Sequence, residues 1–180
     1  MARRGTAALL GLIAAACTGG AKAPPSGLGK PVFEGPVRAL YASADGASLA
    51  FLDGCRDVNV PFLPPRTASC DLRVVASAGG EARRVAAAVP TLPHAVAWSS
   101  AAPVLAALAE YEFPTATGAL VRWDAGGART LAQGVTFHGL GAHGEIGWVA
   151  AGRLAVLLPG EAEPRAPRGA EGVASFDLSP

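Results

Sequence analysis

The feature that most constrains the fold is a phrase that recurs along the chain: a short apolar strand, a turn containing glycine, and a second strand. Its clearest copies align on the turn glycines Gly79, Gly126 and Gly160 and occupy residues 71–85, 118–131 and 152–161. Short strands that alternate with glycine turns at a regular interval predict an all-β domain built from repeated units.

Each unit also carries an earlier hairpin. Its first strand and turn fall at residues 40–46, 96–99 and 137–144, and a further copy opens at residues 173–180. Together the two hairpins predict four strands in each unit of roughly 40 residues. Residues 101–110 are rich in Ala and Leu, which favour helix intrinsically, but their place in the unit predicts a strand.

The turn Ser43-Ala44-Asp45-Gly46, the strand that follows it and the terminal Ser179-Pro180 resemble the repeats of TolB-like and WD-repeat-like β-propellers. The resemblance implies a partial or divergent β-propeller of about three four-stranded blades over residues 37–180. A closed propeller has about four to eight blades. The chain is therefore expected to end within the array, to contain blades that the pattern misses, or to form one piece of an assembly. A β-sandwich is the structural alternative.

The N-terminal segment has the layout of a secretion signal. Arg3 and Arg4 precede an apolar run that ends directly before Cys17. That run is too short to cross a hydrocarbon layer of about 30 Å as a helix. The pattern resembles the lipobox of bacterial lipoproteins, which implies that residues 1–16 are a signal peptide and that Cys17 is acylated. An ordinary cleaved signal peptide is the alternative.

The lipoprotein resemblance also implies a location. Thr18, rather than Asp, follows Cys17, which in enterobacterial lipoproteins accompanies sorting to the outer membrane. We therefore expect a lipid-anchored protein of the cell envelope, on the outer membrane facing the periplasm or on the cell surface. Residues 17–36 are rich in Gly, Pro, Ala and Lys and are expected to form a flexible tether.

The cysteine count agrees with export. With Cys17 assigned to the lipid, Cys55 and Cys70 remain as a pair in an oxidising compartment. We predict that they form a disulfide, the alternative being two free thiols.

The sequence favours no catalytic, metal or cofactor site. Lys and Arg number 15 against 14 Asp and Glu, which gives no electrostatic footprint for nucleic acid. His94, His138 and His143 stand at no ligand spacing, and residues 53–59 lack the pattern of an EF-hand loop. The G-x-G-x-x-G of residues 139–144 precedes a predicted strand, so it is expected to be a turn rather than a dinucleotide site.

Two insertions are predicted to face a partner. Residues 53–69 and 110–117 both join a second strand to a third, and such loops emerge on one face of a propeller. Their apolar side chains are predicted to bind a protein partner or, alternatively, to fold back as a lid: Val60, Phe62, Leu63, Tyr111 and Phe113. The predicted function is a non-catalytic binding or scaffold module. The alternatives are a propeller-type envelope hydrolase and a carbohydrate-binding β-sandwich.

Overall fold

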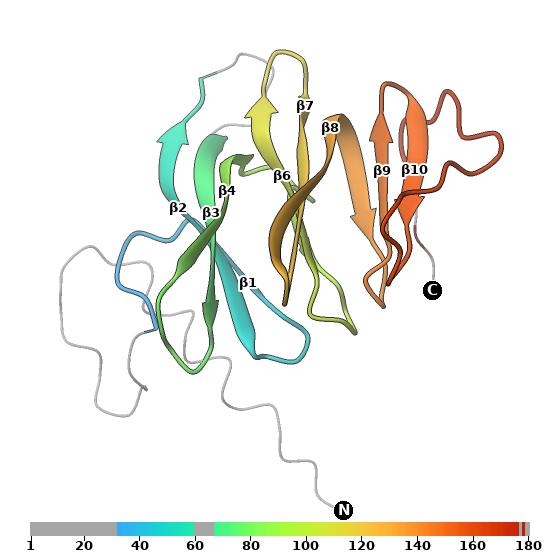
Figure 1. Cartoon of the computed structure of the whole chain (residues 1–180). Coiled ribbons are helices and arrows are strands. Elements are labelled where there is room, and N and C mark those ends of the chain that lie inside the picture. The colour runs from blue at the N-terminus through green and yellow to red at the C-terminus, as the bar shows by residue number, and fades with distance from the viewer. Residues whose placement is uncertain (1–31, 60–66, 177, 179–180) are drawn as a thin grey trace, which may run out of the picture.

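The computed structural model describes residues 32–59, 67–176 and 178, and within them the chain is all-β, as predicted (Figure 1). Two antiparallel sheets form, with strand orders β1-β2-β3-β4 and β10-β9-β8-β7-β6-β5. The strands are β1 (Ala39–Ala42), β2 (Ser48–Asp57), β3 (Ala68–Ala76), β4 (Arg83–Pro90), β5 (Val96–Trp98), β6 (Leu105–Glu112), β7 (Thr117–Asp124), β8 (Gly127–Leu140), β9 (Ile146–Ala150) and β10 (Arg153–Leu157).

The first sheet is the four-stranded up-and-down unit that the sequence predicts. Its opening turn forms because short polar side chains replace backbone partners: Ser43 Oγ donates to Asp45 Oδ1 at 2.6 Å and accepts from the Ser48 amide at 2.9 Å. Gly46 supplies the positive φ of 68° that the turn requires. These hydrogen bonds also hold the pKa of the Asp45 carboxyl below its ordinary value, with the Ser43 hydroxyl as the largest cause.

The second sheet corrects the predicted division into about three four-stranded blades. Its six strands follow one another in chain order, and β8 runs as one strand through the expected boundary between the second and third units. The first half of β8 pairs with β7, and the second half pairs with β9. Gly134, at φ 65°, and register shifts on both sides of Val135 mark the change of partner. Figure 1 shows β8 curving over between its two halves.

Strand β6 has both faces buried, and this explains its residue composition. Leu105, Ala107 and Ala109 join one core cluster, whereas Ala106 and Leu108 join the other. A strand buried on both faces is apolar at successive positions, so the Ala- and Leu-rich segment forms a strand despite its helix propensity.

The two clusters arrange the chain in three layers. The first cluster packs β2–β4 against β5–β7, and the second packs β6 and β7 against β8–β10. The layers succeed one another from left to right in Figure 1. Polar contacts also join them: Trp98 Nε1 donates to the Tyr41 carbonyl at 3.3 Å, and Ser99 Oγ donates to the Gly141 carbonyl at 2.9 Å.

The three tryptophans pack within the layers. Trp148 is buried in the second cluster. Trp98 and Trp123 are partly buried against the first cluster and meet edge to face, with ring centroids 5.6 Å apart.

The segment after β10 covers the outer face of the third layer. Phe176 meets Phe137 of β8 edge to face, with ring centroids 5.3 Å apart. Gly147 makes this contact possible, because a Cβ there would lie 2.5 Å from the Phe176 ring.

A disulfide joins Cys55 of β2 to Cys70 of β3, and this prediction is confirmed. The predicted insertion around it is shorter than expected, because β2 extends to Asp57 and the Val58 amide still donates to the Thr67 carbonyl at 2.9 Å. The expected signal peptide, Cys17 and most of the expected tether lie outside the described residues, as do Val60, Phe62 and Leu63. No helix among the described residues has the length and apolar character needed to cross a membrane.

Candidate functional site

The hairpin between β6 and β7 carries two of the side chains predicted to bind a partner. The Tyr111 and Phe113 rings meet edge to face, with centroids 5.1 Å apart, and both are partly exposed. Backbone irregularities frame the hairpin, since Glu110 has φ 50° and Ala116 has φ 53°. The predicted insertion at residues 110–117 reduces to a tight turn, because β6 extends to Glu112 and β7 begins at Thr117.

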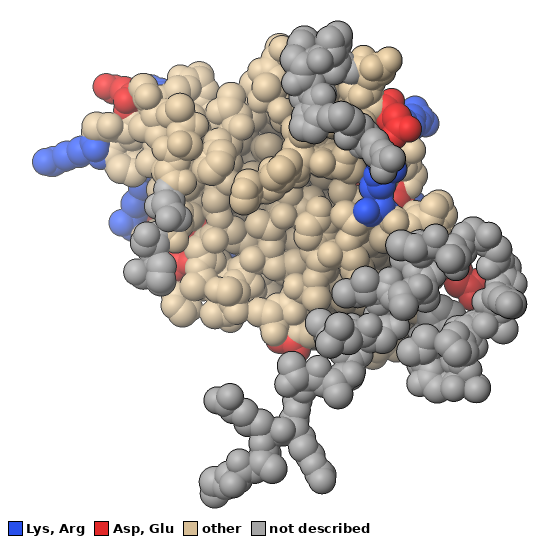
Figure 2. Space-filling view, turned by 180° about the vertical axis from the view of Figure 1, so that it is seen from behind, with Lys and Arg blue, Asp and Glu red and all other residues tan. Residues whose placement is uncertain are grey.

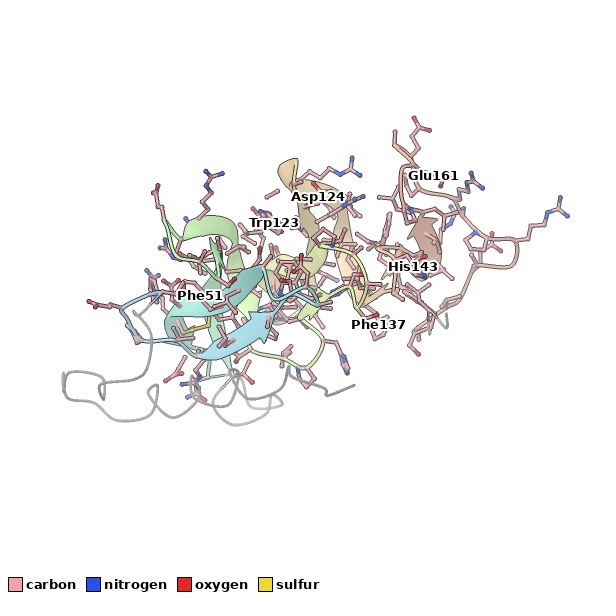
Figure 3. All side chains as sticks on the ribbon, turned by 90° about the horizontal axis from the view of Figure 1, so that it is seen from below. Phe51, Trp123, Asp124, Phe137, His143 and Glu161 are labelled. Carbon is pink, nitrogen blue, oxygen red and sulfur yellow. A yellow bond between two sulfur atoms is a disulfide. The ribbon has the colours of Figure 1, made fainter. Side chains whose placement is uncertain are left out.

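A pocket of about 100 Å³ opens beside this hairpin. Three segments meet there: residues 90–95, which connect the two sheets, the end of β6, and residues 136–138 of β8. Its lining residues are Pro90, Leu92, Pro93, His94, Ala95, Leu108, Tyr111, Thr136, Phe137 and His138. Phe137 is labelled in Figure 3, which views the molecule from below.

The connection between the sheets is held in place by backbone hydrogen bonds. The Leu108 amide donates to the Ala95 carbonyl at 2.9 Å, and the Ala95 amide donates to the Leu92 carbonyl at 3.2 Å. His94 occupies the left-handed region at φ 63°, a conformation that histidine adopts more readily than most residues. These bonds fix the prolyl and leucyl wall of the pocket against β6.

His138 is the chemically distinctive residue of the pocket. It is only 4% exposed, and its Nε2 atom is buried without a hydrogen-bond partner among the described residues. Burial lowers the pKa of His138 to about 4, with a smaller contribution from the nearby His94; a backbone interaction with Ala106 acts in the opposite direction. The imidazole is therefore neutral at neutral pH, and one of its ring nitrogens keeps an unused hydrogen-bonding capacity.

Tyr111 adds a second polar group at the edge of the same pocket. Burial raises the pKa of its phenol above the ordinary value, so the hydroxyl remains protonated at neutral pH. The pocket thus presents a few polar atoms within walls of proline, leucine and aromatic side chains. Such an arrangement suits recognition of a group that is mostly apolar and carries one polar atom.

The other candidate residues of the sequence lie elsewhere. His143 is exposed in the turn before β9, as predicted, and its amide donates to Glu145 Oε2 at 2.9 Å. Gly144 has φ 93°, and the G-x-G-x-x-G segment leads into a strand as expected. Asp53 pairs with Arg73, with 2.9 Å between carboxylate and guanidinium. In the described part of the chain, no three His, Cys, Asp or Glu side chains are placed to hold a metal ion together.

A second and wider hollow of about 270 Å³ lies between β4 and the β6–β8 strands. Arg84, Glu110 and Thr130 are its polar lining residues, and none of their side chains has a buried atom lacking a partner. Figure 2 shows one face of the molecule, on which the visible charged side chains lie mainly at the rim. The hollow therefore carries less specific recognition chemistry than the pocket at His138.

The sequence does not indicate that His94 and His138 line the same pocket. Their 44-residue separation follows from their positions in the sequence, and nothing in that spacing suggests contact with a common site. They meet because β8 turns over near Gly134 and because the 90–95 connection crosses the same end of the fold. A histidine on an otherwise apolar predicted strand was the one available signal.

Comparisons of this chain with protein-family models, curated proteins and solved structures find no match.

Proposed function

We propose that this chain is a non-catalytic binding module of the cell envelope, anchored through a lipid on Cys17, and that it binds a protein partner through the Tyr111–Phe113 hairpin. The observation that carries the proposal is a partly exposed aromatic pair beside a pocket that holds an unpartnered, buried imidazole nitrogen. Aromatic side chains next to pockets dominate the energetics of many protein interfaces.

The geometry favours binding by a preformed surface. The hairpin is short, and Thr115 Oγ1 lies 2.8 Å from Thr117 Oγ1 and 3.3 Å from the Glu112 carbonyl within it. A partner would therefore meet aromatic rings that are already held in place, and little conformational entropy would be lost on association. The disulfide between Cys55 and Cys70 fits the exported location that the proposal requires.

The anchor is tested at Cys17. We expect the wild-type protein from membrane fractions to carry the mass of an acylated N-terminal cysteine. Cys17→Ser should release the protein from the membrane, because the proposed acyl chains are attached through Cys17 and durable anchoring depends on them. Intact-mass analysis of the fractions measures both effects. An unmodified wild-type mass, unchanged in location by Cys17→Ser, contradicts the anchor.

The binding surface is tested by photo-crosslinking in intact cells. We expect a photoreactive amino acid at position 113 to give a discrete envelope adduct, and Tyr111→Ala to weaken affinity for the purified partner by about tenfold to thirtyfold, as loss of an interface anchor does.

Leu40 supplies the matched control. It is 47% exposed on β1, so Leu40→Ala removes a similar apolar side chain from another part of the surface. The same photoreactive group at position 40 should not give the adduct. If Tyr111→Ala lowers the melting temperature steeply and leaves partner binding unchanged, the hairpin is a structural lid and the proposal is wrong.

We further infer that the chain is a divergent relative of the propeller repeats. Three features support this: β1–β4 follow the strand order of a blade, both faces of β6 are buried between neighbouring layers, and Phe176 covers the next face where a following unit would begin. A crystal structure in which Phe176 does not contact Phe137 would count against the relationship.

A further inference from the structure

We propose that the pocket at His138 receives a tyrosine side chain of the partner polypeptide, whose phenol donates a hydrogen bond to His138 Nε2. This inference rests on the binding function proposed above and specifies what the partner presents. It follows from the unpartnered nitrogen, the walls and the size of the pocket, considered in turn.

The buried nitrogen determines the polar part of the ligand. Burial keeps the His138 imidazole neutral at neutral pH, and the imidazole also interacts with the Ala106 backbone. His138 lines the pocket, and its buried Nε2 has no hydrogen-bond partner in the described chain; a buried polar atom left unpaired is costly. A ligand with a hydroxyl donor removes that cost and gains a hydrogen bond.

The walls determine the apolar part. Pro90, Pro93, Leu92, Leu108 and Phe137 surround the opening. These side chains supply most of the lining, and His94, Tyr111, Thr136 and His138 supply its polar part, so the site suits a ring that carries a single polar group. Tyr111 stands at the edge, where an incoming ring can pack against its face or edge.

The size favours one side chain of a larger partner over a free small molecule. At about 100 Å³ the pocket is well below the 300–1,000 Å³ typical of small-molecule sites. A single aromatic ring fills it while the rest of the partner rests on the neighbouring Tyr111–Phe113 hairpin. Tyrosine combines the ring with the hydroxyl donor and is enriched among interface hot spots.

Phenol and toluene test the pocket on the wild-type protein. They have closely similar shapes, and a hydroxyl in phenol replaces the methyl group of toluene. We expect phenol to bind with a dissociation constant on the order of 1 mM and toluene to bind at least tenfold more weakly, although toluene is the more hydrophobic. NMR titration should place the phenol-induced shifts at His138, Leu108 and Tyr111.

His138→Phe supplies the matched variant, because it keeps an aromatic ring and removes the acceptor. We expect it to abolish the preference for phenol over toluene. Equal binding of the two compounds to the wild type, or phenol shifts remote from His138, overturns the pocket chemistry even if position 113 still cross-links to a partner. Conversely, selective phenol binding with no adduct from position 113 overturns the assignment to a partner side chain and the proposed function with it.

Discussion

Replacing both Cys55 and Cys70 by alanine lowers the free energy of unfolding by about 3 kcal/mol, because the disulfide closes a loop of 15 residues in the unfolded chain. For a chain of this size we expect the melting temperature to fall by roughly 6–12 °C. Alanine is the appropriate replacement, since Cys70 is only 2% exposed in the first core cluster and a serine hydroxyl would be buried there.

Reduction of the wild-type protein controls for the change in side-chain volume. It breaks the same bond and leaves both sulfur atoms in place, so chemical denaturation of the reduced protein should reproduce most of the loss. Equal stability of the reduced and oxidised wild type would show that the bond does not constrain the unfolded chain. The two single alanine variants should each lose about as much as the double variant, because either one removes the whole crosslink.

Many of the strands could be predicted because the residues in and next to their turns determine where the strands begin and end. The Ser43-Ala44-Asp45-Gly46 turn contains the hydroxyl, carboxylate and glycine that its own hydrogen bonds and positive φ require. The strand at β6 could be predicted from its place in the repeat, although its intrinsic propensity favours helix. The position in the repeat was informative because it depends on the packing of the strand, and both faces of β6 are buried. Intrinsic propensity does not include that burial.

The path of β8 could not be predicted in the same way. The sequence around Gly134 contains an end of one predicted strand and the start of another, and both halves do form strands. Whether the chain leaves the sheet or bends and continues depends on the pairing of Val135 with both Gly118 and Ala150. These partners lie on different strands, so the outcome is decided by tertiary pairing rather than by the local pattern.

The candidate site was predictable only in part for a related reason. Tyr111 and Phe113 stand out in the sequence because aromatic residues in a short connection are unusual. The pKa of His138 depends instead on the segments that surround its side chain, and residues 90–95 and β6 line the same pocket. Burial by distant segments changes the pKa of a side chain without leaving a mark in its neighbouring sequence.

Acidification from pH 7 to pH 4 destabilises the wild-type protein through His138 by about 3 kcal/mol. The folded protein holds the pKa of this imidazole at about 4, whereas the ordinary value of 6.5 applies in the unfolded chain. Between these two values the unfolded chain binds a proton that the folded protein does not, so the free energy of unfolding falls as the pH falls. The loss corresponds to about 3 kcal/mol at pH 4, and it levels off below that pH, where both states bind the proton.

His138→Phe isolates this contribution from the carboxylates that titrate over the same range. It should remain folded, since it places an aromatic side chain in a largely apolar pocket and removes a buried atom that has no partner. Denaturation at several pH values should show that the free energy of unfolding falls by about 3 kcal/mol more in the wild type than in the variant as the pH falls from 7 to 4. His94→Ala, which changes an exposed neighbour, should retain nearly the full dependence. Parallel curves for the wild type and His138→Phe would mean that the imidazole is protonated equally in both states, and hence that His138 is not buried as a neutral group.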